Sequence, residues 1–166
     1  MLNVRRAKKE DIGHVRDMIQ ELADFENMSD GPRLSESDLI RDAGLDGGPE
    51  YCEIYVLTKE NVSTEYIGYA ICFKSYSTWN GRCFFLEDIY VRPQHRQLGA
   101  GKHLFLAVAA RAKELNCSRL DFHVLEWNPA RKFYENLGAK DLTVSEKWYL
   151  YRLEGDNLTN LANKYS

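Results

Sequence analysis

The feature that most constrains the fold of this chain is a glycine-rich turn between a strand-like and a helix-like segment. Residues 82–91 are rich in β-branched and aromatic side chains, as in a strand, whereas residues 102–115 are amphipathic, as in a surface helix. The turn between them contains Arg96-Gln97-Leu98-Gly99-Ala100-Gly101. The first N–H groups of a helix have no partner within the helix and carry partial positive charge. Because glycines let an anion approach this backbone closely, the turn predicts a phosphate-binding site.

The spacing of the glycines narrows the kind of phosphate ligand. A Walker loop needs a glycine where Arg96 stands and a serine or threonine where His103 stands. A dinucleotide-binding fingerprint needs a third glycine at the position of Leu104. What remains is the pattern Arg-x-x-Gly-x-Gly. An ordinary turn that leads into a surface helix stays open as the alternative.

Composition excludes several classes of protein. A chain of 166 residues is expected to form a single domain over residues 1–166. The net charge of -3 does not favour nucleic-acid binding. No apolar run reaches the ~18 residues of a membrane span, and the N-terminus lacks the apolar stretch of a signal peptide. Because the cysteines show no Cys-x-x-Cys spacing, we expect free thiols in a cytoplasmic protein and no metal site.

Hydrophobic periodicity and turn residues predict a series of helices and strands. The expected strands are 4–7, 52–58, 66–76, 82–91, 119–125 and 147–153. The expected helices begin near Asp11, at a capping box from Ser35, at Lys102, and at an Asn128-Pro129 cap. Asn80-Gly81 predicts a two-residue hairpin turn, and a polar turn is expected at 61–65. The order β-α-α-β-β-β-α-β-α-β predicts an α/β, or mixed α+β, fold.

Three further segments carry a resemblance to a known family. They are Phe85-Leu86-Glu87-Asp88-Ile89-Tyr90-Val91, Glu126-Trp127-Asn128 and Phe133-Tyr134-Glu135-Asn136-Leu137-Gly138-Ala139. Together with Arg-x-x-Gly-x-Gly, they resemble the GNAT N-acetyltransferases, although Ala139 stands where an aromatic residue is usual. The resemblance implies acetyl-CoA as cosubstrate. It also implies the GNAT fold, a mixed, mostly antiparallel twisted sheet with splayed middle strands and flanking helices.

Other segments are similar to one branch of that family, the diamine (spermidine/spermine) acetyltransferases. They include Glu21-Leu22-Ala23-Asp24-Phe25-Glu26 and Glu146-Lys147-Trp148. Ser77-Thr78-Trp79 and Asp141-Leu142-Thr143 look more like the members that acetylate thialysine, a sulfur-containing analogue of lysine. Ser77 stands where the polyamine-preferring members carry an acid, which favours a shorter amine. The resemblance also implies a homodimer with its active sites near the interface.

The resemblance assigns roles in acetyl transfer to two side chains. An alkyl ammonium has a pKa of about 10.4, so roughly one amine in a thousand is neutral at pH 7 and a base is needed. Glu87 is the expected base, acting through a water, and Tyr134 is the expected general acid toward the leaving thiolate. A strand N–H near Ile89 or Val91, freed by a bulge or splay after Asp88, would stabilise the oxyanion. From the residues alone, Glu87 is equally an ordinary strand carboxylate, and Tyr134 a packing residue.

The matched positions also give binding residues. For acetyl-CoA these are Ile89, Tyr90, Val91, Arg96, Gln97, Leu98, Gly99, Ala100, Gly101, Lys102, Asn128, Pro129, Ala130, Arg131 and Leu137. For the amine they are Phe25, Glu26, Trp79, Glu87, His123, Glu146 and Trp148. Acids would attract the ammonium group, and the two tryptophans would wall its alkyl chain through cation–π contacts. Each tryptophan is equally well explained as a core or interface residue, and His123 as a structural histidine.

Two other functions remain open from the sequence. An acetyltransferase for protein lysines or N-termini would need an open groove, whereas bulky Trp79 and Trp148 favour a walled pocket. A non-catalytic acyl-CoA-binding module is the other alternative, and the presence of both Glu87 and Tyr134 argues against it.

Overall fold

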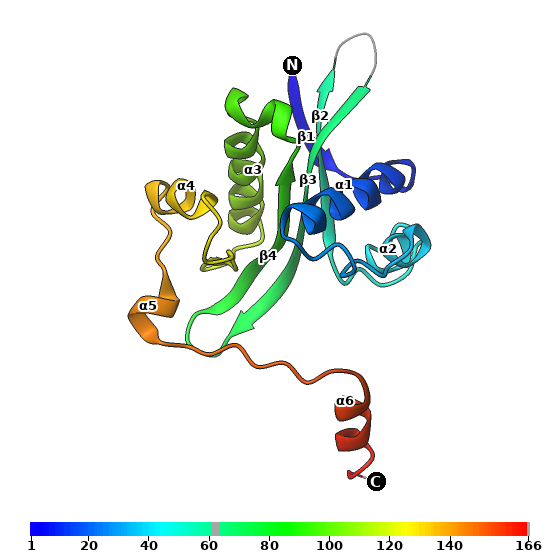
Figure 1. The fold of residues 1–166 in the computed structure, drawn as a ribbon, viewed down its shortest axis with the longest axis vertical. Coiled ribbons are helices and arrows are strands. Elements are labelled where there is room, and N and C mark those ends of the chain that lie inside the picture. Colours follow the sequence, from blue (N-terminus) through cyan, green and yellow to red (C-terminus); the bar gives the residue numbers. More distant parts are fainter. Residues whose placement is uncertain (61–63, 166) are drawn as a thin grey trace. The chain divides into compact units, whose positions relative to one another are not determined.

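The computed structural model describes residues 1–60 and 64–165, and it divides into two compact units, Met1–His123 and Val124–Ser166. Within the described residues, the first unit is built on a five-stranded sheet in the order β1-β2-β3-β4-β5 (Figure 1). The strands are β1 Leu2–Arg6, β2 Glu53–Glu60, β3 Thr64–Ser77, β4 Gly81–Val91 and β5 Leu120–Phe122. All neighbouring pairs are antiparallel except β4 and β5. The mixed, mostly antiparallel sheet is confirmed, while part of the expected turn at 61–65 lies outside the described residues.

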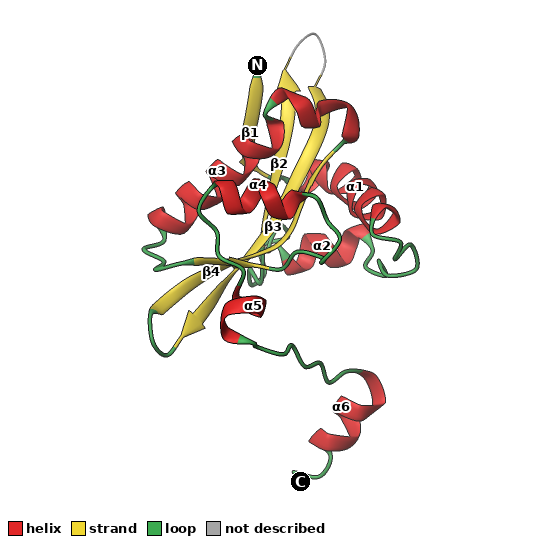
Figure 2. Ribbon diagram, turned by 60° about the vertical axis from the view of Figure 1, so that its left-hand side comes forward, coloured by secondary structure: helices red, strands yellow, loops and turns green. Residues whose placement is uncertain are grey.

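Helices cover both faces of this sheet (Figures 1 and 2). The helices are α1 Ile12–Phe25 and α2 Glu36–Asp42 on one face and α3 Ala100–Glu114 on the other, with short 3-10 turns η1 Lys9–Asp11 and η2 Pro93–Leu98. Ile12, Val15 and Met18 form the fully buried stripe of α1 and pack in the core with the sheet. The capping box expected from Ser35 is present at α2, where Asp38 N–H donates to the Ser35 hydroxyl.

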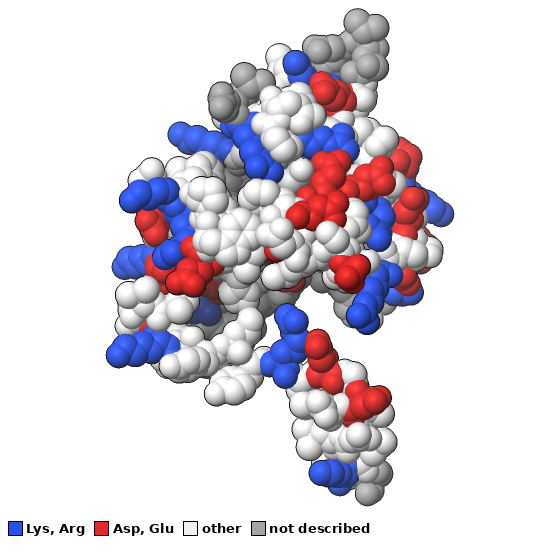
Figure 3. Space-filling model, viewed as in Figure 1, with Lys and Arg blue, Asp and Glu red and all other residues white. Residues whose placement is uncertain are grey.

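Acidic side chains gather over α1 on the face of the molecule drawn in Figure 3. Asp17, Glu21 and Asp24 belong to this helix, and Glu26 is its C-cap. Grouped carboxylates raise the local concentration of cations. The end of α1 is therefore electrostatically suited to a cationic ligand.

The second unit contains helices α4 Ala130–Asn136, α5 Leu142–Glu146 and α6 Gly155–Ala162 (Figure 2). The prediction of a strand at 147–153 is wrong, because these residues have no regular secondary structure. A strand exists only when its backbone pairs with another strand, and within the described chain this segment pairs with none. Trp148, Tyr149, Leu150 and Tyr151 are consequently 67–88% exposed.

Two other expected boundaries differ. The β3–β4 hairpin closes at Ser77 opposite Gly81, so its loop has three residues, Thr78, Trp79 and Asn80, and the two-residue turn was wrong. The Ser77 hydroxyl accepts hydrogen bonds from the N–H groups of Trp79 and Asn80, and Gly81 takes a φ of 81°. Such a serine turn followed by a glycine with positive φ competes with the tighter Asn-Gly turn. β5 is also shorter than the expected 119–125.

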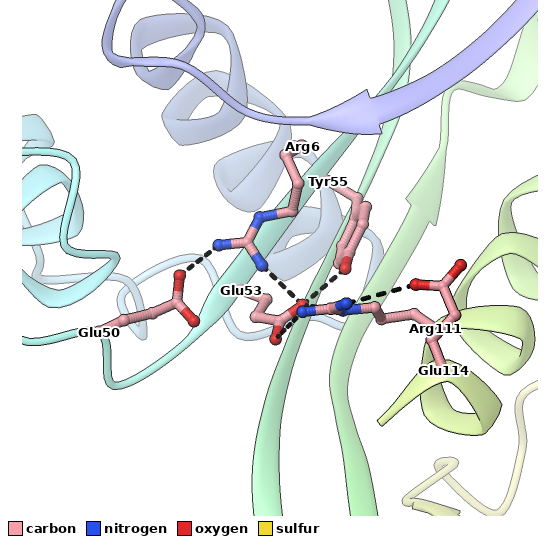
Figure 4. Close-up of polar contacts among 6 residues, drawn as sticks. All are labelled: Arg6, Glu50, Glu53, Tyr55, Arg111 and Glu114. Atoms are coloured by element: carbon pink, nitrogen blue, oxygen red, sulfur yellow. Dashed lines mark hydrogen bonds and ion pairs between the residues drawn. The ribbon is translucent and has the colours of Figure 1, made fainter. Parts of the chain in front are cut away.

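A buried carboxylate joins α3 to the sheet (Figure 4). Glu53 of β2 is 1% exposed and pairs with Arg6 of β1 at 2.6 Å and with Arg111 of α3 at 2.9 Å. The Tyr55 hydroxyl donates a third bond, of 2.6 Å, to the same carboxylate. Burial alone would raise the pKa of Glu53, but the hydrogen bonds from Arg111 and Tyr55 and the charge of Arg6 together lower it. The charged carboxylate thus holds the helix that follows the glycine-rich turn against two strands.

We expect Glu53→Gln to lower the free energy of unfolding at pH 7 by about 2 kcal/mol, because Arg6 and Arg111 would lose a charged partner. A carboxyl whose pKa is lowered on folding stabilises the protein above its unfolded pKa of about 4.3. That stability is lost as the pH falls through the lowered folded pKa, so the difference between the variant and the wild type should shrink as the pH falls below about 4. Urea unfolding at pH 7 and pH 3 measures both values.

Glu114→Gln is the matched control, since Glu114 pairs with the same Arg111 at 3.3 Å but its side chain is 66% exposed. It should change the free energy of unfolding by less than about 0.5 kcal/mol. An equal loss for Glu53→Gln at both pH values would contradict the electrostatic explanation and indicate packing instead.

Candidate active site

The candidate site is centred on β4, where two irregularities meet. β4 pairs with β5 only from Phe84 to Leu86. On its other edge, Leu86 lies opposite Cys72 and Asp88 opposite Ile71, so Glu87 is the extra residue of a β-bulge. Beyond Leu86, the edge of β4 that faced β5 has no neighbouring strand among the described residues. The expected splay of β4 from its neighbour is present. Both the end of pairing with β5 and the bulge lie before Asp88, whereas they were expected after it.

The two consecutive carboxylates of β4 have different surroundings. Glu87 is exposed, whereas Asp88 is half-buried and accepts a hydrogen bond of 3.1 Å from the hydroxyl of the fully buried Tyr69. Burial raises the pKa of Asp88; the Tyr69 hydrogen bond opposes this, and the charge of Glu87 adds to it. Burial, and then the charge of Asp88, also raises the pKa of Glu26 at the end of α1. Asp88 therefore lies within electrostatic range of both Glu87 and Glu26, and the three carboxylates form a group around it.

Asp88 is the member of this group that sequence reasoning did not select. Perturbed carboxylates cluster at functional sites, and here the perturbed strand carboxylate is Asp88. A signal was present in the sequence, because a tyrosine buried in a strand needs a partner for its hydroxyl. Tyr69 lies directly opposite Tyr90 in the β3–β4 ladder, and finding Asp88 required that register.

The glycine-rich turn has the geometry of an anion cradle. Gly99 is in the left-handed conformation, with φ 73° and ψ 7°, and α3 begins at the next residue. A Cβ added at Gly99 or Gly101 would meet no atom within 4 Å, so the backbone there is open. Gly99 is also the N-cap and has no side chain with which to cap the first N–H groups of α3. These residues with Lys102 fit a pyrophosphate, while the side chains of Gln97 and Leu98 lie outside the described part.

In the second unit, α4 begins one residue later than expected, at Ala130 with Pro129 as its N-cap, although Asn128 still makes a side-chain bond to the first turn. Asn128 accepts a hydrogen bond of 2.9 Å from the N–H of Ala130, and Pro129 has helical backbone angles. Tyr134 on the resulting helix is 9% exposed, and burial raises the pKa of its phenol to about 12. Arg131 pairs with Asp141 at 2.9 Å, so its guanidinium helps to hold this unit together. Leu137 is the C-cap of the same helix.

The remaining amine-facing candidates are exposed. Trp79 at the hairpin tip is 84% exposed and Trp148 is 67% exposed, which excludes a core position for both. The Trp148 indole donates a hydrogen bond of 2.7 Å to Glu146. His123 lies just beyond the shortened β5, and its ring packs edge-to-face on Phe85 with 5.1 Å between the ring centroids.

Comparison with known proteins supplies the family. The acetyltransferase (GNAT) family matches residues 16–139. Thialysine N-epsilon-acetyltransferase of Bos taurus is 40% identical over 166 residues, which cover 97% of each chain. The chain belongs to the GNAT family. GNAT enzymes take the acetyl group from acetyl-CoA, and this chain is an acetyl-CoA-dependent N-acetyltransferase.

Other GNAT relatives and structures agree with this assignment. Spermidine/spermine N(1)-acetyltransferase-like protein 1 of Homo sapiens is 32% identical over 162 residues, 96% of this chain and 23% of that protein. An integron cassette protein of V. cholerae has a TM-score of 0.73 at 23% identity, covering 97% of each chain. AAC(6')-Iy, bound to a CoA bisubstrate analogue, has a TM-score of 0.70 at 20% identity, covering 93% of this chain and 99% of its own. These structural likenesses confirm the GNAT fold.

The described residues offer neither a metal site nor a membrane-spanning helix. Within residues 1–60 and 64–165, no group of three or more histidine, cysteine, aspartate or glutamate side chains is placed to hold a metal ion. In the same part of the chain, no helix combines the length and the apolar character needed to cross a bilayer.

We expect Gly101→Asp to separate acetyl-CoA binding from stability. The open space at Gly101 accepts a side chain, and an acid in the first turn of a helix interacts favourably with its dipole, so the melting temperature should not fall. The same charge repels a pyrophosphate, and the Kd for acetyl-CoA should rise about tenfold or more. Calorimetric titration and thermal unfolding measure the two effects, with Gly101→Ala as the uncharged control. An unchanged Kd would contradict the phosphate cradle.

Proposed function

We propose that this enzyme acetylates the terminal primary amine of thialysine or of a similarly short cationic amine. The observation that carries the proposal is the β4 bulge, which presents Glu87 and Asp88, with Glu26 in electrostatic range of Asp88, beside a strand edge that pairs with no strand among the described residues. The identity of 40% with a thialysine N-epsilon-acetyltransferase over 97% of the chain supports the substrate class. Ser77, where the polyamine-preferring members carry an acid, favours the shorter amine.

The first chemical task is to bind an ammonium group and remove its proton. Glu26 and Asp88 would attract the cation, since the two carboxylates lie within electrostatic range of each other. Glu87, exposed at the bulge, would accept the proton through a water and release it to solvent. The neutral amine can then attack the acetyl carbon with its lone pair.

The second task is to stabilise the carbonyl oxygen of the acetyl group as it gains negative charge. A strand N–H that is not used in the sheet is a fixed donor, and it needs no reorganisation during the reaction. We assign this donor to Ile89 or Val91 on the part of β4 beyond its pairing with β5. The turn from Arg96 to Lys102 would hold the pyrophosphate, with the residues near Asn128 and Arg131 along the rest of the cofactor.

The third task is to assist the departure of the thiolate of CoA. Tyr134 would serve as the general acid, and its raised pKa of about 12 keeps the phenol protonated. Complete proton transfer from such a phenol to a thiolate, whose acid has a pKa of about 8.5, is uphill. Tyr134 would therefore act mainly as a hydrogen-bond donor to the leaving sulfur.

We propose that the two units work as a single catalytic domain, because the family match over residues 16–139 spans the division after His123. We also propose a cytoplasmic location, which the four free thiols support.

We further propose that the enzyme is a homodimer in which Trp148–Leu153 is buried. This segment exposes three aromatic side chains and two leucines in the single chain, and dimer interfaces bury such residues. Light scattering at micromolar concentration should give twice the mass of one chain, and Leu150→Asp should give a monomer with an unchanged circular dichroism spectrum. A monomeric wild type would contradict the proposal.

A protein amine is the second candidate substrate. The exposure of Trp79 and Trp148 favours it, because neither ring walls a closed pocket within the described chain. A lysine peptide therefore belongs in the substrate panel.

We expect kcat/KM for thialysine to exceed that for spermidine by about tenfold, the scale of one charged hydrogen bond. The panel comprises thialysine, lysine, putrescine, spermidine, spermine and the lysine peptide. Ser77→Asp should raise kcat/KM for spermidine, and Ser77→Asn is its control, since both side chains can keep the turn that the Ser77 hydroxyl makes. Preference for spermidine by the wild type, or for the peptide, would overturn the substrate assignment and leave the chemistry in place.

Tyr134→Phe should lower kcat by about 100-fold with the Kd for acetyl-CoA nearly unchanged, since only a proton donor is removed. Because burial raises the pKa of Tyr134 to about 12, the wild type should show no fall in kcat from phenol ionisation up to pH 10.5. Stopped assays of CoA release between pH 6.5 and 10.5 measure both values. Near-normal kcat for the variant would remove Tyr134 from this role.

A further inference from the structure

Arg96 is held at three points by groups that belong to the amine side of the site and to β4. Its Nε–H donates a hydrogen bond of 2.8 Å to the carbonyl of Val91, the last residue of β4. Its guanidinium carbon lies 5.1 Å from the ring centroid of Phe25 and 5.5 Å from that of Tyr90. Both distances are within the range of a cation–π contact. An arginine bound in this way ties the phosphate turn to two aromatic rings.

Phe25 links this contact to the amine-binding end of α1. It is the last residue of α1, and the next residue is Glu26, which lies within electrostatic range of Asp88. Asn27 then has a φ of 58°, so the chain leaves the helix at once. An amine bound between Glu26 and Asp88 would therefore order the residue whose ring Arg96 covers.

A second arginine anchors the middle of α1 to the sheet rather than to the turn. Arg92 pairs with Glu21 of α1 at 2.7 Å and donates a hydrogen bond of 2.8 Å to the carbonyl of Tyr66 in β3. This pair fixes the helix where it crosses the strand ends. Its last residue, Phe25, contacts Arg96, which stands three residues before Gly99.

We propose that Arg96 is a positioning residue that couples binding of the amine to binding of acetyl-CoA. A bound amine orders Phe25, whose ring together with that of Tyr90 then holds the guanidinium of Arg96. Arg96 in turn fixes the backbone that leads to Gly99 and α3. Acetyl-CoA that then binds the turn loses less conformational entropy, because the turn is already ordered, and it therefore binds more tightly. This inference rests on the proposed function, because it places the amine at the end of α1.

The test measures the Kd of CoA by calorimetry with and without saturating thialysine, since CoA forms a ternary complex that cannot react. We expect thialysine to lower the Kd of CoA for the wild type by about fivefold. This is the lower end of common coupling factors, since cation–π contacts of an exposed arginine such as Arg96 are weak. Arg96→Lys keeps the charge but loses the planar contact, and it should reduce the factor to near one. Phe25→Leu should do the same, and the double variant should lose nothing more.

Phe25→Tyr is the matched control, because it keeps an aromatic face and should keep the fivefold factor. If Arg96 only contacted the phosphates of CoA, the result would differ. Arg96→Lys would then raise the Kd of CoA by the same factor with and without thialysine. That equal weakening, or a wild type that binds CoA without coupling, would overturn the inference alone. A wild type that neither binds CoA nor releases it from acetyl-CoA would overturn the proposed function and this inference with it.

Discussion

A backbone N–H or C=O group in a sheet needs a hydrogen-bond partner, and beyond Leu86 a neighbouring strand lies along only one edge of β4 within the described residues. β3 accompanies β4 along its length, but β5 accompanies it only as far as Leu86. The rest of the site follows from that difference. The bulge at Glu87 lies at the same point, so a carboxylate is presented next to a part of β4 whose outer edge pairs with no strand in the described chain. The strand then leads into the turn to which we assign the pyrophosphate of acetyl-CoA.

The turn itself needs a helix that does not move. α3 buries Leu104 and Val108 completely, and its far end is fixed by Arg111 on the buried carboxylate of Glu53. Because Glu53 also pairs with Arg6, the same charge fixes β1 and β2. The position of the N-terminus of α3 thus depends both on side chains buried along the helix and on an ion pair at its opposite end. A charged residue with no part in the proposed chemistry thus helps to hold the helix that follows the proposed pyrophosphate turn.

The sequence predicted those helix starts and turns that depend on a capping residue or a glycine only a few residues away. Ser35 and Asp38 predicted a helix start, Asn128 predicted another, and Gly99 predicted the open turn. The strand expected at 147–153 failed because pairing depends on a partner that sequence periodicity does not contain. Asp88 was missed for a related reason, since its pKa depends on Tyr69 and on burial. The contact of Arg96 with Phe25 joins residues far apart in the chain and had no sequence signal.

The bulge also means that the fold and the proposed catalytic carboxylate can change independently of each other. Leu86 and Asp88 face consecutive residues of β3, so a chain lacking Glu87 would form a regular ladder with the same partners. Such a deletion would leave the sheet and its core in place while it removes the presented carboxylate and straightens the strand. With Glu87 as the proposed base, deletion of a single codon would therefore remove catalysis and leave the fold in place. Percentage identity between two aligned sequences would hardly change with such a deletion. Relatives are therefore best compared by how β3 and β4 pair around Glu87.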